Sequence, residues 1–200
     1  MDKYSAKLTG EPFLYNETKI IAKHILLGED IDILKQRNIK ENLIMYKSPN
    51  AIVRVNSPIF RRISVFNDSM LDVFVNGDLE SSKLLLLYSI MKTDNLVRDF
   101  VIEVYREHIL NLKSTIEKYE INNWFEKIYA DSNLCNISDS TKYKLKQVTL
   151  KIMVDSGILQ KKENMFNIII PILTDKFKKL LIDSGDIKYV SWIGGTLWKV

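Results

Sequence analysis

Apolar residues recur three or four positions apart along most of this chain, with polar residues between them. This spacing is typical of helices that bury one face. The expected helices cover Pro12–Gly28, Asp30–Ile39, Ser48–Phe66, Asn67–Asn76, Asp78–Met91, Asn95–Leu110 and Ile121–Tyr129. Because a proline removes a hydrogen-bond donor from a helix, we expect Pro58 to break or kink the third of these helices near Ser57.

The pattern changes after residue 137. A run of capping residues, 138–141, precedes a long helix, Lys142–Asp155, which stops at Ser156-Gly157. A short strand Ile158–Gln160, a polar turn Lys161–Asn164 and a second strand Phe166–Ile170 follow, and a further helix begins at Thr174. A helix followed by a strand, a polar turn and a strand is typical of a winged-helix domain.

The 200 residues are enough for one domain or two small ones. We expect a mostly α protein in two parts. Residues 1–115 would form a helical bundle with a basic, helix-turn-helix-like region, and residues 116–200 a winged-helix-like domain with a short β-hairpin and C-terminal helices. The pattern does not decide whether the tail Trp192–Trp198 packs or frays.

Composition narrows the class of protein. The single cysteine, Cys135, excludes an internal disulfide and a multi-cysteine metal site. The longest uncharged runs, Asn164–Thr174 and Tyr189–Trp198, are shorter than the ~20 apolar residues of a membrane-spanning helix. The first residues have no apolar segment typical of a signal peptide. We therefore expect a cytoplasmic protein without a membrane partner.

The net charge of +4 is unevenly distributed. Residues 35–62 carry seven basic side chains and one acidic one, and residues 142–162 carry six lysines and one aspartate. Between these two blocks, residues 63–137 carry seven basic and twelve acidic side chains. Basic blocks are either solvated helix faces or the electrostatic footprint of a polyanion partner. The presence of two separate blocks favours the polyanion.

The helix Lys142–Asp155 is the expected recognition helix of the winged-helix pattern. Ser140, Lys144, Gln147 and Lys151 form one polar stripe on it, because they lie four, three and four positions apart. Lysine and glutamine suit phosphates and base edges. Winged-helix domains also act as protein-interaction modules, so a pure protein interface stays an alternative.

Motifs for catalysis are missing. The chain has no phosphate-binding glycine loop, no dinucleotide fingerprint and no serine nucleophile elbow. The two histidines, His24 and His108, are far apart in the sequence. We therefore expect no enzyme activity, no cofactor, no metal and no small-molecule substrate.

The run 87–96, LYSIMKTDNL, with Phe100 and Glu103-Val104-Tyr105 after it, resembles the central motif of BrxA proteins, which are small components of bacteriophage-exclusion (BREX) defence islands. Other stretches agree in order: Ile21-Ala22 before Gly28, Glu41-Asn42-Leu43, the arginine-rich region Ser48–Arg62, Ser140-Thr141, Lys144-Leu145, Gln147-Val148 and Gly157-Ile158-Leu159. The resemblance covers nearly the whole chain. It implies an all-helical, non-catalytic protein that binds duplex DNA beside larger proteins of the island, which include a DNA methyltransferase and ATPases.

We therefore expect a non-enzymatic, DNA-binding accessory component of a BREX system, whose partners are double-stranded DNA and other BREX proteins. The alternative is an assembly subunit of the same system that touches no nucleic acid, and RNA binding by the N-terminal helices is a third possibility. From charge and periodicity, the candidate DNA contacts are Lys47, Arg54, Arg61, Arg62, Ser140, Thr141, Lys144, Gln147, Lys151, Lys161 and Lys162.

Overall fold

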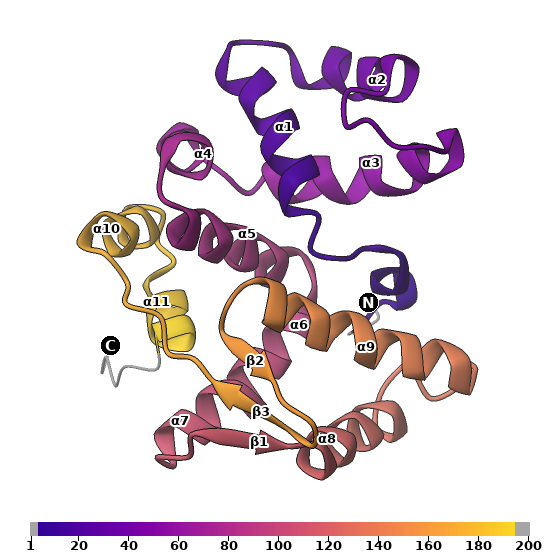
Figure 1. Ribbon diagram of the computed structural model, residues 1–200, viewed down its shortest axis with the longest axis vertical. Coiled ribbons are helices and arrows are strands. Elements are labelled where there is room, and N and C mark those ends of the chain that lie inside the picture. The colour runs from indigo at the N-terminus through magenta and orange to yellow at the C-terminus, as the bar shows by residue number, and fades with distance from the viewer. Residues whose placement is uncertain (1–3, 195–200) are drawn as a thin grey trace.

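The computed structural model describes residues 4–194 and is mostly helical, as the spacing predicts (Figure 1). Its N-terminal half contains η1 (Ala6–Gly10), α1 (Tyr15–Leu26), α2 (Ile31–Glu41), α3 (Pro49–Ile63), α4 (Asp68–Asn76) and α5 (Leu79–Thr93). The 3-10 turn η1 is absent from the sequence prediction, and α1 begins three residues after Pro12.

Short polar side chains begin several of these helices where the sequence predicts. Asp30 accepts hydrogen bonds from the backbone N–H groups of Asp32 and Ile33, both at 3.0 Å, and Asp78 accepts one from Ser81 at 2.7 Å. Such caps satisfy N–H groups that have no partner within the helix. The helix α1 stops just before Gly28, whose φ of 90° favours glycine.

Of the break or kink expected near Ser57, the break is wrong, because α3 runs unbroken through Pro58. Pro58 removes a single backbone hydrogen bond from the helix interior. On the same helix Val55, Ile59 and Ile63 lie four residues apart, and all three are buried in the core. Packing of this apolar stripe outweighs the local cost of the proline.

A long helix crosses the middle of the molecule behind the sheet. It consists of α6 (Asn95–Phe100), the π-helical segment η2 (Val101–Arg106) and α7 (Glu107–Leu110). Together they cover the expected helix Asn95–Leu110. Phe100 and Tyr105 are fully buried on it. The hydroxyl of Tyr105 lies 3.0 Å from the carbonyl oxygen of Ile169 and 3.2 Å from that of Ile193, so this helix holds two later segments of the chain.

The C-terminal part has the expected helix, strand, turn and strand, and one further strand. Its elements are β1 (Thr115–Glu117), α8 (Lys118–Ala130), α9 (Asp139–Asp155), β2 (Leu159–Lys161) and β3 (Met165–Ile168). The strands form an antiparallel sheet in the order β1-β3-β2, with Ile116 opposite Phe166 and Lys161 opposite the same Phe166. The strand β1 is too short for its alternation to be recognised in the sequence.

The chain ends its described part with α10 (Asp175–Asp183) and α11 (Ile187–Gly194), which lie beside α4 and α5. The carboxylate of Asp186, between these two helices, accepts hydrogen bonds from the Tyr88 hydroxyl at 2.7 Å and from Lys92 Nζ at 2.8 Å. Trp192 is half-buried on α11. Trp198 and the rest of the expected tail lie outside the described residues.

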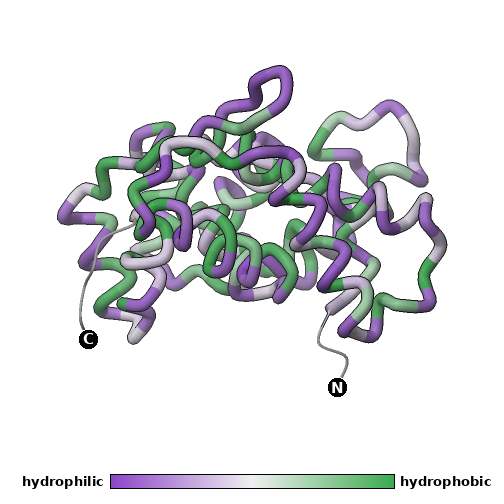
Figure 2. Tube along the Cα trace, turned by 90° about the horizontal axis from the view of Figure 1, so that it is seen from below, coloured by the Kyte–Doolittle hydropathy of each residue, from purple (hydrophilic) through white to green (hydrophobic). Residues whose placement is uncertain are grey.

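Contacts also join the two parts of the chain. The turn η1 packs against α9, and the backbone of Tyr4 exchanges two hydrogen bonds with the side chain of Asn133. Apolar stretches run through the middle of the molecule, while hydrophilic stretches follow its outer turns (Figure 2). The division at residues 115 and 116 stays a prediction. Between Tyr4 and Gly194 no helix is long and apolar enough to cross a membrane.

Candidate nucleic-acid interface

The helix α9 presents a polar face to solvent and an apolar face to the core. The Ser138 side chain caps it by accepting a hydrogen bond from the Thr141 N–H group. Leu145 and Ile152 are fully buried and anchor the helix. The opposite stripe, which contains Lys144, Gln147 and Lys151, is exposed. The stripe predicted from the spacing is therefore present on the surface, with Ser140 exposed and Thr141 half-buried at its N-terminal end.

The β2–β3 hairpin stands beside this stripe. Its turn is closed by a hydrogen bond of 2.9 Å from the Lys162 N–H group to the carbonyl oxygen of Met165. Lys161 and Lys162 are both exposed, whereas Phe166 on β3 is buried. The hairpin thus carries two ammonium groups at its tip above an apolar base.

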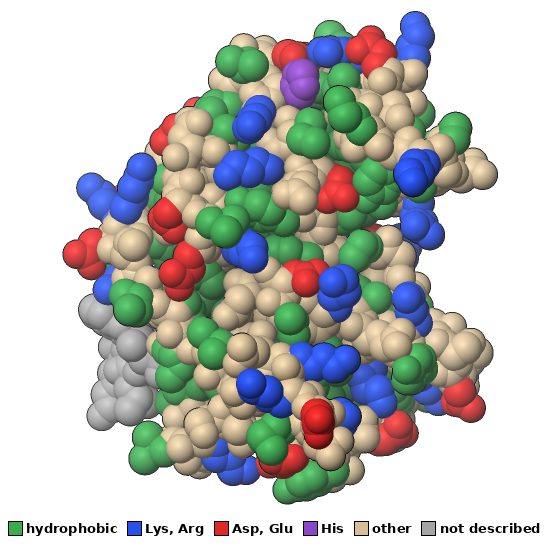
Figure 3. All heavy atoms as spheres, viewed as in Figure 1, with side chains coloured by type: hydrophobic (Ala, Val, Ile, Leu, Met, Phe, Trp, Pro, Cys, Tyr) green, Lys and Arg blue, Asp and Glu red, His purple; other side chains and the backbone are tan. Residues whose placement is uncertain are grey.

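A groove of about 460 Å³ separates α9 from the hairpin, and we call it the α9–hairpin groove. Its lining residues are Lys144, Gln147, Val148, Leu150, Lys151, Val154, Asp155, Lys161 and Phe166. Four candidate residues, three from α9 and Lys161 from the hairpin, therefore meet at one groove. Basic side chains gather over α9 and the hairpin on the face that Figure 3 shows.

The charges in this groove are mostly free to act on a ligand. Lys151 lies 3.1 Å from Asp155, four residues on, in an exposed ion pair of small energetic value. Lys144, Lys161 and Lys162 have no ion-pair partner within residues 4–194. A phosphate that enters the groove therefore meets ammonium groups from both the helix and the hairpin.

The N-terminal basic block divides into exposed and inward-facing residues. Lys47 and Arg54 are exposed. The side chain of Arg54 passes close to η1, because a Cβ atom on Gly10 would lie 3.6 Å from its Cδ. Since η1 packs against α9, Arg54 is connected to the neighbourhood of the groove through that turn.

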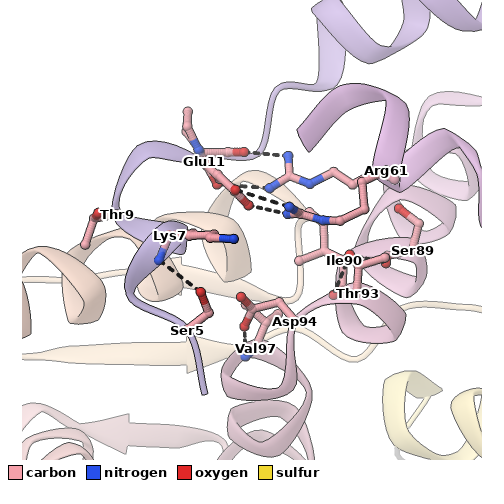
Figure 4. A network of polar contacts seen from close by, with 12 residues as sticks. Ser5, Lys7, Thr9, Glu11, Arg61, Ser89, Ile90, Thr93, Asp94 and Val97 are labelled. Carbon is pink, nitrogen blue, oxygen red and sulfur yellow. Dashed lines mark hydrogen bonds and ion pairs between the residues drawn. The ribbon is translucent and has the colours of Figure 1, made fainter. Parts of the chain in front are cut away.

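Arg62 holds the structure together, contrary to the expectation that it faces DNA, while the side chain of Arg61 pairs within the fold and stays partly exposed. Arg61 is half-buried and forms an ion pair with Glu11, which faces it in Figure 4. Arg62 is 1% exposed. Its guanidinium donates hydrogen bonds to the carbonyl oxygens of Pro12 at 2.7 Å, Phe13 at 3.1 Å and Glu11 at 3.0 Å. This placement leaves Arg62 almost no surface for a phosphate.

Burial shifts the pKa of Arg62 and of the nearby Asp94. Burial lowers the pKa of Arg62 to about 10, although the nearby Glu11 acts in the opposite direction. Burial also raises the pKa of Asp94, whose carboxylate accepts hydrogen bonds from the N–H groups of Leu96 and Val97. Figure 4 shows Asp94 beside Val97. These groups connect η1, α3 and the start of α6, and they serve the fold.

Sequence reasoning missed the apolar part of the groove. Leu150 and Val154 are half-buried on α9, and Phe166 closes the groove from β3. The positions of Leu150 and Val154, four apart on α9, gave a signal for a second apolar stripe. The pairing of Phe166 with this stripe depends on the hairpin register, which only the fold determines.

The fold and the groove define a class: a mostly helical protein with a small antiparallel sheet, in which a basic helix lies beside a β-hairpin. A crystal structure of an uncharacterized protein from Magnetospirillum magneticum has the same fold, with a TM-score of 0.78, 17% identity and coverage of 96% of this chain and 97% of that one. The BrxA family model matches residues 2–185. The chain belongs to the BrxA family.

Two relatives, both named BREX protein BrxA, match the chain. The BREX protein BrxA of Bacillus cereus (strain H3081.97) is 28% identical over 193 residues, which are 96% of each chain. The BREX protein BrxA of Escherichia coli O9:H4 (strain HS) is 25% identical over 154 residues, 75% of this chain and 71% of the relative. These matches confirm the resemblance that the central motif predicts.

Proposed function

We propose that this chain is a non-enzymatic component of a BREX phage-defence system that binds the phosphate backbone of duplex DNA through the α9–hairpin groove. The family and the names of its relatives support the place in a BREX system. The meeting of Lys144, Lys151 and Lys161 at one groove is the observation that carries the DNA-binding part.

The geometry suits a winged-helix mode of contact. In that mode the recognition helix enters the major groove while the hairpin reaches the backbone beside it. Here α9 would be the recognition helix, with Gln147 toward base edges and Lys144 toward phosphates. Lys162 at the hairpin tip would hold a neighbouring phosphate. Exposed Lys47 and Arg54 would add long-range attraction rather than base contacts.

Two features of the groove support a binding role without catalysis. The polar residues of the groove are lysines and a glutamine, with one aspartate already paired to Lys151. A groove open to solvent and lined by ammonium groups binds an anionic polymer without the paired acid and base that hydrolysis needs. We place this function, and the contact with other BREX proteins, in the cytoplasm.

The test measures binding of a fluorescent 20-base-pair duplex to the full chain by anisotropy as salt increases. If Lys144, Lys151, Lys161 and Lys162 each neutralise one phosphate, log K falls with log salt at a slope of about −3.6, or about 150-fold between 50 and 200 mM. The Lys144→Glu, Lys151→Glu double variant reduces the slope to about −1.8. An unchanged slope and affinity would remove α9 from the interface.

A matched control uses the same change of charge elsewhere. Lys176 and Lys179 on α10 are exposed, and α10 lies on the opposite side of the molecule from the hairpin tip in Figure 1. The Lys176→Glu, Lys179→Glu variant keeps wild-type binding if the groove is the interface. If the two double variants weaken binding equally, only net charge matters. Absence of binding by the unaltered chain at 50 mM salt would favour the assembly-subunit alternative.

A further inference from the structure

A second depression begins where the α9–hairpin groove ends. One part has a volume of about 420 Å³ and is lined by residues 13–17 at the start of α1, together with Leu79, Lys83 and Asp155. The other part, of about 270 Å³, is lined by Leu79, Glu80, Lys83, Leu84, Ser156, Gly157 and Pro171. Since Leu79 and Lys83 line both parts, they form one depression, which we call the α1–α5 hollow.

The hollow exposes apolar surface to solvent. Leu79 stands at the first position of α5 with 59% of its surface exposed, while Leu84, five residues on, is buried. Pro171 closes the far side. In Figure 3, apolar side chains lie over the start of α5 with acidic ones beside them. A pocket with an exposed leucine at its edge suits an apolar side chain from another molecule.

The rim of the hollow has the opposite charge from the α9–hairpin groove. Glu17, Glu80 and Asp155 line it beside one lining cation, Lys83, and Asp155 also pairs with Lys151. Glu17 is half-buried at the rim and accepts a hydrogen bond of 2.7 Å from the Tyr46 hydroxyl. Asp155 lines both depressions, so the change of sign occurs at the C-terminal end of α9. A phosphate backbone is repelled where the carboxylates gather.

We propose that the α1–α5 hollow binds a segment of a protein partner that carries an apolar side chain flanked by lysine or arginine. The apolar side chain enters beside Leu79, and the flanking cations meet Glu80 and Glu17. The proposed protein-binding surface therefore differs in charge from the proposed nucleic-acid surface, although the two lie next to each other. The proposal does not depend on DNA binding, because the hollow shares only Asp155 with the groove.

The probe is a synthetic array of nine-residue peptides with Leu, Phe or Trp at the centre. One half of the array has lysine on both sides of the central residue, and the matched half has glutamate. The full chain, labelled with a fluorophore, is applied at 150 mM salt, and the strongest binders are titrated by anisotropy. We expect the lysine-flanked half to retain the chain and the glutamate-flanked half not to.

Variants locate the binding. Leu79→Asp and Glu80→Lys alter exposed residues, so circular dichroism and the thermal midpoint should show intact folding, and each variant should weaken peptide binding at least tenfold. Leu27→Asp and Glu126→Lys make the same changes at exposed positions away from the hollow and should bind as the unaltered chain does.

Equal retention of both halves of the array would overturn the proposal. So would folded Leu79→Asp and Glu80→Lys variants that bind peptides normally. If the two variants instead lose affinity for the labelled duplex and no peptide binds, the hollow belongs to the nucleic-acid interface. Failure of DNA binding in the anisotropy assay leaves the peptide result unaffected, so the two proposals can fail separately.

Discussion

Replacing Arg62 with methionine tests whether this arginine, near the end of α3, serves the fold rather than DNA. Methionine fills part of the same space but donates no hydrogen bond. The change removes three hydrogen bonds from a buried cation to the carbonyl oxygens of residues 11–13. These carbonyl groups are left without their partner at a site that water barely reaches, where Arg62 is 1% exposed.

The magnitude follows from the number and kind of these bonds. A hydrogen bond from a charged donor contributes about 1.5–3 kcal/mol, and a polar group left unsatisfied in the interior costs about 1–3 kcal/mol. Part of the gain is offset because burial disfavours the charged guanidinium, as its lowered pKa of about 10 shows. We therefore expect Arg62→Met to lower the free energy of unfolding by about 3–5 kcal/mol.

Urea unfolding followed by circular dichroism measures this change. Arg54→Met is the matched control, since Arg54 lies on the same helix and is exposed, and it should change the free energy of unfolding by less than about 0.5 kcal/mol. A loss below about 1 kcal/mol for Arg62→Met would refute the reasoning. Charge reversal at Arg62 would remove the same three hydrogen bonds and unfold the chain, so it cannot report on DNA binding.

Three further changes test other parts of the structure. Burial alone would raise the pKa of Glu120, but hydrogen bonds from Lys113 and a backbone N–H group lower it to about 2. The stability that ionised Glu120 contributes is therefore complete above its unfolded pKa of 4.5 and is lost as the pH falls toward 2. Glu120→Gln should make the free energy of unfolding less dependent on pH below 4.5. Gly157→Ala should cost about 1–2 kcal/mol in thermal unfolding, because Gly157 has a φ of 91° that disfavours a side chain. None of the described atoms lies within 4 Å of the added Cβ, so backbone strain is the whole cost. Tyr88→Phe should cost about 1–2 kcal/mol by the same measurement, since among residues 4–194 the Asp186 carboxylate then keeps hydrogen bonds from the Lys92 side chain alone. Wild-type acid unfolding in the first variant, or wild-type stability in either of the others, would contradict these accounts.

Local signals predicted the helices and their ends well, because the physical causes are local. The carboxylates of Asp30 and Asp78 cap the helices that follow them, and Gly157 ends α9. The spacing of Lys144, Gln147 and Lys151 placed them on one exposed face for the same reason, since three residues on a single helix keep their relation wherever the helix packs.

Features that depend on distant residues escaped the sequence. The strand β1 forms because Ile116 pairs with Phe166 of β3, which lies fifty residues later in the chain. The helix α3 continues through Pro58 because neighbouring elements bury its apolar stripe. In both cases a weak or unfavourable local preference is overruled by packing that no short window of sequence contains.

The two basic blocks show how far charge can be read from sequence. Both are short of acidic neighbours in the chain, and by count they look alike. The partner of Arg61 is Glu11, fifty residues earlier, and those of Arg62 are backbone carbonyl oxygens that no charge count includes. The C-terminal block keeps four of its six lysines exposed, because Lys144 and Lys151 lie on an outer helix face and Lys161 and Lys162 at a hairpin tip. A charge count therefore predicts how much cationic surface a chain has available, and the fold decides which part of it is left for a ligand.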